Sequence, residues 1–172
     1  MNTEPRKLSV VVLISSDGEW AAVRPRLPAH HPEAAAFATP YGDGLEVLLP
    51  FAARRHPVRY LHGGWGKIAA AGSAQYAVDR WQPDLVVNLG TCGGFRGAIE
   101  RGDIVLVTRT LVYDIIEQMG DQAAAEAHYA TDLDLSWLRP PLPMDVRRSP
   151  LVSGDRDLVP AEVRALQDRF GA

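Results

Sequence analysis

The chain has 172 residues, of which 47% are hydrophobic and 23% are charged, and its formal net charge is -3. This length favours a single domain over residues 1–172, and the composition is far from that of disordered or membrane proteins. The mild negative charge gives no basic surface, so we expect no nucleic-acid partner. The longest aliphatic run near the start, Val10 to Ile14, is too short to span a bilayer, so we expect no membrane partner.

Apolar patterning in the first half predicts several strands and one short helix. Both alternating faces of the stretch at 8–15 are aliphatic, which is typical of a buried strand. Residues 19–27 predict one or two amphipathic helical turns closed by Pro25 and Pro28, and residues 30–43 have the composition of a loop. Two further strands are expected at 44–52 and 58–64, with a turn at 54–57.

The strongest helix signal covers Lys67–Trp81, which is rich in alanine at helical spacing and is followed by Pro83. Residues 122–130 and 137–148 have no clear periodicity and are expected to be irregular. Strands that alternate with helices predict an α/β fold with parallel strands. The later elements expected are strands at 84–90, 103–114 and 149–155 and a helix at 160–170.

Several familiar motifs are incomplete in this sequence. The stretch GGWGKIA at 63–69 lacks the earlier glycine and the Ser or Thr of a phosphate-binding loop. Its spacing also fits a dinucleotide-binding turn, but the following strand ends in Gly90 and Thr91 rather than in an acidic residue, so helix-to-sheet packing is the better interpretation. The histidines have no metal-ligand spacing, and we expect no metal and no cofactor.

Small residues follow the strand at 84–90 in the order Gly90, Thr91, Cys92, Gly93 and Gly94. They contribute little to a core, but they allow the backbone to approach a ligand closely. Cys92 is the single cysteine, which favours the reducing cytoplasm. No histidine stands beside Cys92 in the motif, so we interpret it as a small packing residue rather than a nucleophile.

Three stretches together resemble the nucleoside phosphorylase and nucleosidase superfamily. They are VVVLISSDGEW at 10–20, the long run from GGWGKIAAAG at 63–72 through NLGTCGGF at 88–95 to GDIVLV at 102–107, and LVSGDRDLV at 151–159. The 5'-methylthioadenosine/S-adenosylhomocysteine nucleosidase branch is the most similar. The resemblance implies a twisted mixed sheet between helices, a three-layer sandwich, with ligands at the strand ends.

The resemblance also implies a site. Phosphorylases of the superfamily commonly hold phosphate with arginines where this chain has Glu19 and Asn88. A carboxylate repels a phosphate dianion but can orient and deprotonate water, so Glu19 is the implied catalytic residue of a hydrolase. A solvated residue at a helix start is the alternative for Glu19. The implied substrate-binding residues are Ser15, Ser16, Trp65, Thr91, Cys92, Gly93, Asp157 and Leu158. Trp65 either covers the 5' substituent or packs beneath the helix.

Two departures from the family pattern accompany these expectations. Asp157 stands where the family commonly has an aromatic residue that stacks on the base. The family's C-terminal elements, which supply a ribose-binding glutamate, the aspartate that protonates the purine, a strand and a helix, would lie beyond Ala172. We therefore expect this chain, alone, to be an incomplete domain and a weak or inactive enzyme.

The function implied by the resemblance is hydrolysis of a purine nucleoside such as 5'-methylthioadenosine or S-adenosylhomocysteine, which releases adenine and belongs to methionine salvage. A purine or uridine nucleoside phosphorylase and a noncatalytic nucleoside-binding protein are the alternatives. The expected partners are a small-molecule nucleoside and further copies of the chain, in a homodimer or a higher oligomer.

Overall fold

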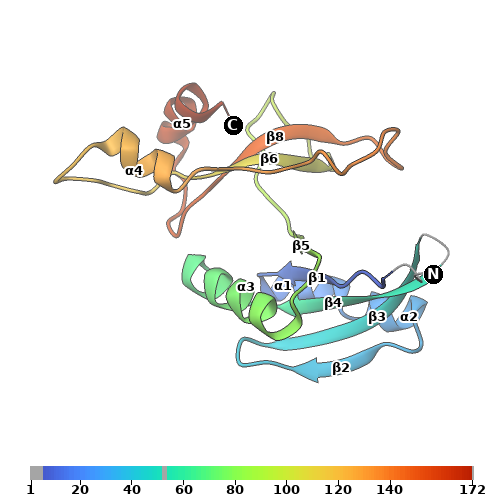
Figure 1. Cartoon of the computed structure of the whole chain (residues 1–172). Helices are drawn as coiled ribbons and strands as arrows, with labels where there is room; N and C mark the ends of the chain where they lie inside the picture. The colour runs from blue at the N-terminus through green and yellow to red at the C-terminus, as the bar shows by residue number, and fades with distance from the viewer. Residues whose placement is uncertain (1–5, 52–53, 172) are drawn as a thin grey trace, which may run out of the picture. The chain divides into compact units, whose positions relative to one another are not determined.

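The computed structural model describes residues 6–51 and 54–171 (Figure 1). Contacts divide the chain into two compact units, Met1–Cys92 and Gly93–Ala172, and each unit is described by itself. A single domain over residues 1–172 stays a prediction. Among the described residues, none of the helices has the length and apolar character needed to cross a bilayer.

A five-stranded mixed sheet with the strand order β2-β3-β4-β1-β5 forms the centre of the first unit. Its strands are β1 (Val10–Ile14), β2 (Ala35–Ala38), β3 (Asp43–Phe51), β4 (Arg54–His62) and β5 (Leu85–Asn88). Strand β1 pairs in parallel with β4 and β5, whereas β2 with β3 and β3 with β4 are antiparallel. The register pairs Ile14 with His62 and Leu13 with Asn88. The carboxyl ends of three strands therefore lie together at one edge.

Helices cover both faces of this sheet, which gives three layers within the first unit (Figure 1). On one face, Val12 and Ile14 pack with Trp20 of α1 (Asp17–Val23), next to α2 (Arg26–His30). On the other face, Val11 and Leu13 pack with Ala77 of α3 (Lys67–Trp81). This burial on both faces explains why β1 is aliphatic at every position.

The second unit contains a three-stranded sheet in the order β7-β6-β8. Strand β6 (Val105–Val112) pairs in parallel with β8 (Arg147–Ser153) and antiparallel with β7 (Thr131–Asp132). The remaining elements are α4 (Gln122–His128), the 3-10 helix η1 (Pro160–Glu162) and α5 (Val163–Phe170). An ion pair between Glu126 and Arg169 joins α4 to α5. The buried side chains of this unit include Leu111 and Leu166.

The predicted strands in the first half, the helix Lys67–Trp81 and the three later strands are confirmed with shifts of a few residues at their ends. One helix was expected over 19–27, but the structure has two, because the chain breaks between Val23 and Arg26, where Pro25 precedes α2. The loop expected at 30–43 is wrong in part, since it contains β2. Most β2 side chains are exposed, so its strand signal comes from backbone pairing with β3.

The turn expected at 54–57 is also wrong, because those residues belong to β4, and the connection at 52–53 lies outside the described residues. His56 within β4 is buried, and its ring accepts a hydrogen bond from the Leu8 amide at 2.9 Å. The irregular stretch expected at 122–130 contains α4, which Asp121 caps by accepting two backbone hydrogen bonds.

Candidate functional site

Three chain segments converge where the parallel strands of the first unit end. Ser15 and Ser16 follow β1 and lead into α1, the glycines at 63–64 follow β4, and Gly90 and Thr91 come shortly after β5. The Gly63 amide donates to the Ile14 carbonyl at 2.9 Å and so holds the first two segments together. Open α/β sheets bind their ligands at the carboxyl ends of parallel strands, which makes this edge the candidate site.

Glu19 lies at this edge, and residues from two strand ends hold its carboxylate. The Ser16 hydroxyl accepts a hydrogen bond from the Glu19 amide at 3.2 Å, and the Ser16 amide donates to Glu19 Oε2 at 3.3 Å, which together form a capping box. The Thr91 hydroxyl donates to Glu19 Oε1 at 2.7 Å, and the Thr91 amide donates to the same oxygen. Glu19 therefore connects the end of β1 to the segment after β5.

These contacts determine the ionisation of Glu19. Partial burial raises the pKa of the carboxyl, but the hydrogen bonds from Thr91 and Ser16 outweigh it and hold the pKa below the ordinary value of 4.5. Glu19 is therefore a carboxylate at neutral pH. As an anion it is an acceptor only, and its partly exposed side chain can also accept a hydrogen bond from water.

Gly90 packs directly against the Glu19 carboxylate. A Cβ atom at position 90 would lie 3.0 Å from Glu19 Oε1 and 3.2 Å from Oε2. The glycine therefore leaves the space that the carboxylate occupies, and a larger residue would displace the carboxylate from Thr91.

If Glu19 has the catalytic role that the resemblance implies, replacement of Gly90 by alanine is expected to lower kcat by about tenfold, because small displacements of a catalytic group are costly. The free energy of unfolding should change little, since Gly90 is exposed and its φ is not positive. Steady-state kinetics and urea denaturation measure the two effects. Gly18→Ala in α1 is the matched control, because a Cβ there meets nothing within 4 Å. Equal kcat values for the two variants would contradict a catalytic role of Glu19.

The other predicted residues of the first unit differ in exposure. Ser15 and Ser16 are half-buried, and Thr91 is exposed. Trp65 is 85% exposed, so the structure does not bear out the alternative in which it packs beneath the helix. Cys92 is also exposed, and our interpretation of it as a packing residue is wrong. A substrate-binding role for each of these residues stays a prediction.

Gly93, Asp157 and Leu158 belong to the second unit, and their roles stay predictions as well. The segment before Asp157 is well anchored within that unit. Arg156 makes two hydrogen bonds of 2.8 Å to the Glu162 carboxylate, and the Tyr113 hydroxyl donates to the Arg156 carbonyl. The bond to Arg156 lowers the pKa of Glu162. These contacts hold Arg156, which precedes Asp157 and Leu158 in the chain.

Sequence reasoning missed one feature of the edge, the pair formed by His62 and Asp17. His62 is the last residue of β4, and its Nε2 lies 3.2 Å from Asp17 Oδ1. The spacing of the histidines argues against a metal site, but it predicts no role for His62. The available signal was the position of His62 at a strand end, immediately before Gly63 and Gly64.

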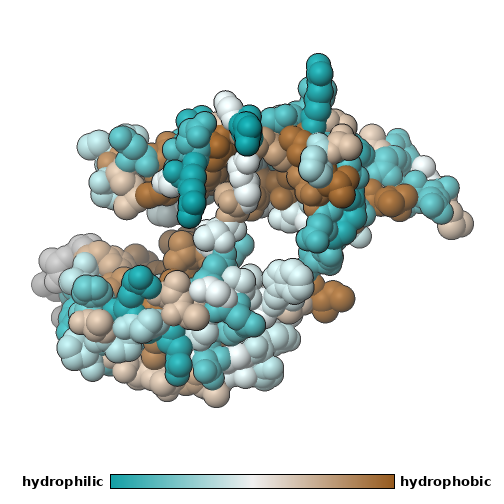
Figure 2. All heavy atoms as spheres, turned by 180° about the vertical axis from the view of Figure 1, so that it is seen from behind, coloured by the Kyte–Doolittle hydropathy of each residue, from teal (hydrophilic) through white to brown (hydrophobic). Residues whose placement is uncertain are grey.

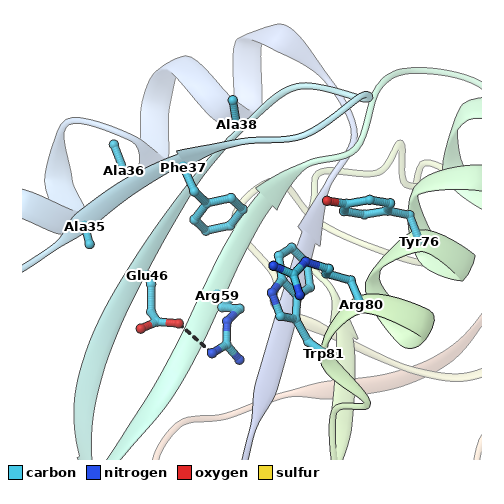
Figure 3. Close-up of a pocket in the computed structure, with 9 residues that line it drawn as sticks. All are labelled: Ala35, Ala36, Phe37, Ala38, Glu46, Arg59, Tyr76, Arg80 and Trp81. Carbon is cyan, nitrogen blue, oxygen red and sulfur yellow. Dashed lines mark ion pairs between the residues drawn. The ribbon is translucent and has the colours of Figure 1, made fainter.

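A hollow of about 330 Å³ lies elsewhere on the first unit (Figure 3). Arg59 pairs there with Glu46 at 2.7 Å and stacks over the Trp81 ring. The lining residues are Ala35, Ala36, Phe37, Ala38, Glu46, Arg59, Tyr76, Arg80 and Trp81. None of the predicted site residues lines this hollow. Across residues 6–51 and 54–171, no three side chains of the His, Cys, Asp and Glu types form a metal-binding group.

The molecule is thus an α/β protein with mixed sheets and flanking helices, and it carries an anchored carboxylate at the carboxyl ends of its parallel strands. A model of the phosphorylase superfamily matches residues 10–140. The chain belongs to this superfamily, as its motifs predict.

Individual relatives agree with the family. The 5'-methylthioadenosine/S-adenosylhomocysteine nucleosidase of Bacillus licheniformis is 31% identical over 111 residues, which is 63% of this chain and 43% of that protein. The matched segment therefore spans less than half of that relative's length.

Solved structures confirm the predicted fold class. The crystal structure of the Campylobacter jejuni 5'-methylthioadenosine/S-adenosyl homocysteine nucleosidase matches with a TM-score of 0.75 and 15% identity, covering 96% of this chain and 73% of that chain. A futalosine hydrolase mutant of Helicobacter pylori matches with a TM-score of 0.71 and 12% identity, covering 96% and 75% of the two chains. At such identities the likeness establishes the fold alone.

Proposed function

We propose that the protein hydrolyses the N-glycosidic bond of a purine nucleoside such as 5'-methylthioadenosine or S-adenosylhomocysteine and releases adenine. The observation that carries this proposal is the ionised Glu19 carboxylate, held at the strand edge by Thr91 and by the Ser16 amide. Relatives named as nucleosidases support the choice of substrate class. The same proposal places the protein in methionine salvage.

The position and charge of Glu19 fit hydrolysis better than phosphorolysis. Cleavage of the bond between C1' and the purine leaves the bonding electrons on the purine, which takes up a proton to become adenine, and develops positive charge on the ribose, as in other glycoside hydrolyses. A nearby carboxylate stabilises that charge and orients a water molecule toward C1'. A pKa below the ordinary value makes Glu19 a weak base, but water becomes acidic as it bonds to a cationic carbon, so a weak base is sufficient. The same carboxylate would repel a phosphate dianion.

Thr91 has a second role in this proposal. Its hydroxyl donates to Glu19 and keeps its lone pairs free to accept a hydrogen bond from a ribose hydroxyl. It can therefore bind substrate and hold Glu19 at once. We assign the remaining substrate contacts to Ser15, Ser16, Trp65, Cys92, Gly93, Asp157 and Leu158.

Incubation with 5'-methylthioadenosine, with and without phosphate, tests the reaction type. In keeping with the weak activity expected of this chain alone, we expect slow release of free adenine at the same rate in both conditions, measured by chromatography. Release that requires phosphate would overturn hydrolysis in favour of a phosphorylase. Calorimetric binding of the nucleoside without any turnover would instead identify a noncatalytic binding protein.

The pH dependence of kcat/KM should report the ionisation of Glu19 in the free enzyme. Because hydrogen bonds hold its pKa below the ordinary value, we expect kcat/KM to stay constant from neutral pH into the acid range and to fall only as the pH drops through the lowered pKa. The stability that these hydrogen bonds provide is present above the unfolded-state pKa and is lost over the same acid range. Tryptophan fluorescence at each pH separates unfolding from titration. An acid limb well above pH 4.5 would contradict this role.

We also propose that the protein acts in the cytoplasm on a small-molecule nucleoside and associates with itself. The single cysteine favours a reducing compartment. Trp65 and Ile68 are 85% and 89% exposed. Figure 2 shows further hydrophobic residues, in brown, on the surface of the second unit. Exposed apolar surface of this kind favours protein contacts. Light scattering after size-exclusion chromatography should give at least twice the mass of the 18.8 kDa chain.

A further inference from the structure

Helix α1 carries two carboxylates that face different strands. The helix is only seven residues long, so its orientation depends on tertiary contacts rather than on its own stability. Glu19 contacts Thr91, which follows β5, whereas Asp17 contacts His62 at the end of β4. Strand β1 lies between β4 and β5 in the sheet. The first turn of α1 is therefore held on both sides of the strand that precedes it.

His62 is enclosed on several sides. Its ring stacks on the Trp20 ring with a centroid distance of 5.8 Å and an interplanar angle of 6°. A Cβ atom at Gly42 would lie 3.3 Å from His62 Nδ1 and 2.6 Å from the His62 carbonyl oxygen, so only glycine fits there. Trp20 is 7% exposed and is the neighbour of Glu19 in the chain. The His62 ring therefore packs against the residue next to Glu19 in the same turn of α1.

The polar contact of His62 is close but not aligned as a hydrogen bond. Nε2 lies 3.2 Å from Asp17 Oδ1, and yet it has no hydrogen-bond partner with suitable geometry among the described residues. The Asp17 side chain is fully exposed and can reorient to align with Nε2. A buried ring nitrogen without a hydrogen-bond partner is costly, so a hydrogen bond between His62 Nε2 and the Asp17 carboxylate would be favourable.

We propose that His62 is a positioning residue for Glu19, acting through its stacking on Trp20 and its contact with Asp17. The proposal rests on the proposed function, because it assigns His62 to the orientation of the residue that activates water. His62 itself need not touch the substrate. The expected consequence is that loss of the His62–Asp17 contact loosens the hydrogen bonds between Glu19 and Thr91.

The direct test is the pKa of Glu19, measured by carbon NMR of the labelled carboxyl in Asp17→Asn. Removal of a neighbouring negative charge would by itself lower this pKa. If Asp17 acts through His62, the loosened hydrogen bonds raise the pKa toward 4.5 instead. In a His62→Phe background, which keeps a stacking ring, Asp17→Asn should then only lower the pKa. A fall in both backgrounds would overturn the proposal.

Kinetics provide a second test with a matched control. We expect His62→Phe to lower kcat about tenfold with little change in KM, because misplacement of a catalytic group slows the chemical step. His56→Phe is the control, since His56 is a buried histidine of the same strand that contacts Leu8 and Phe51 rather than α1. It should lower stability without lowering the kcat of the folded protein. Equal kcat losses in both variants would mean that His62 has only a structural role.

The two hypotheses fail in different ways. The wild-type chain could release no adenine while Asp17→Asn raises the Glu19 pKa in the wild-type background and lowers it in His62→Phe. This result would reject the nucleosidase activity and support the positioning role of His62. An active wild type with unchanged kcat and Glu19 pKa in His62→Phe would remove that role and keep the nucleosidase.

Discussion

Replacement of Glu19 by glutamine is expected to lower kcat by about 10² to 10⁴, the range for loss of an acid or base catalyst. Glutamine keeps the size and one oxygen that can accept from Thr91, but it has no negative charge to stabilise the ribose cation or to accept a proton. The substrate KM should change little, because in the proposed hydrolysis the carboxylate acts on the transition state. Adenine release by purified Glu19→Gln measures the effect.

A second glutamate serves as the control for this substitution. Glu33 is exposed and paired with Arg55, and its pKa is also lowered. Glu33→Gln should leave kcat close to that of the wild type. This result would show that the loss of kcat in Glu19→Gln depends on the position of Glu19 and not on the loss of any one negative charge. Wild-type activity in Glu19→Gln would remove Glu19 from the mechanism, leaving it as a residue that caps α1.

Replacement of Ile14 by alanine is expected to destabilise the protein by about 2 to 5 kcal/mol, the usual cost of truncating a fully buried aliphatic side chain. Ile14 is 0% exposed and packs with Val12 and Trp20 in the core beneath α1. It is also the last residue of β1, so the cavity would lie directly below the strand edge that holds Glu19. Urea denaturation followed by fluorescence measures the free energy of unfolding.

Leu8→Ala is the matched control for this truncation, since Leu8 is 44% exposed and precedes the same strand. It should cost much less stability than Ile14→Ala. If both variants unfold at the same urea concentration as the wild type, the packing described for β1 is wrong.

Sequence patterns predicted the elements in which the spacing of apolar side chains follows their burial. Strand β1 is aliphatic because helices cover both of its faces, and α3 begins and ends at the predicted residues because its alanines recur at helical spacing before Pro83. Strand β2 was missed because its exposed alanines give no alternation, and its pairing partner β3 determines its conformation. Helix α4 was missed for a similar reason, because it has no buried residue to create a period.

The candidate site was predictable only in part. The family motif pointed to Glu19 and Thr91, which lie 72 residues apart in the chain, and the structure shows the hydrogen bonds that join them. That Gly90 leaves room for the carboxylate could be inferred only as a general need for small residues. The contact of His62 with Asp17 depends on the pairing register of β1 with β4, which no local pattern encodes.

The most direct measurement is a crystal structure of the Glu19→Gln variant with bound 5'-methylthioadenosine. We expect the ribose at the ends of β1 and β5. A water molecule should lie within about 3 Å of the residue 19 side chain and be placed to attack C1'. A nucleoside bound at a different surface, or a ribose whose C1' is turned away from position 19, would contradict the assignment of Glu19 as the residue that activates water.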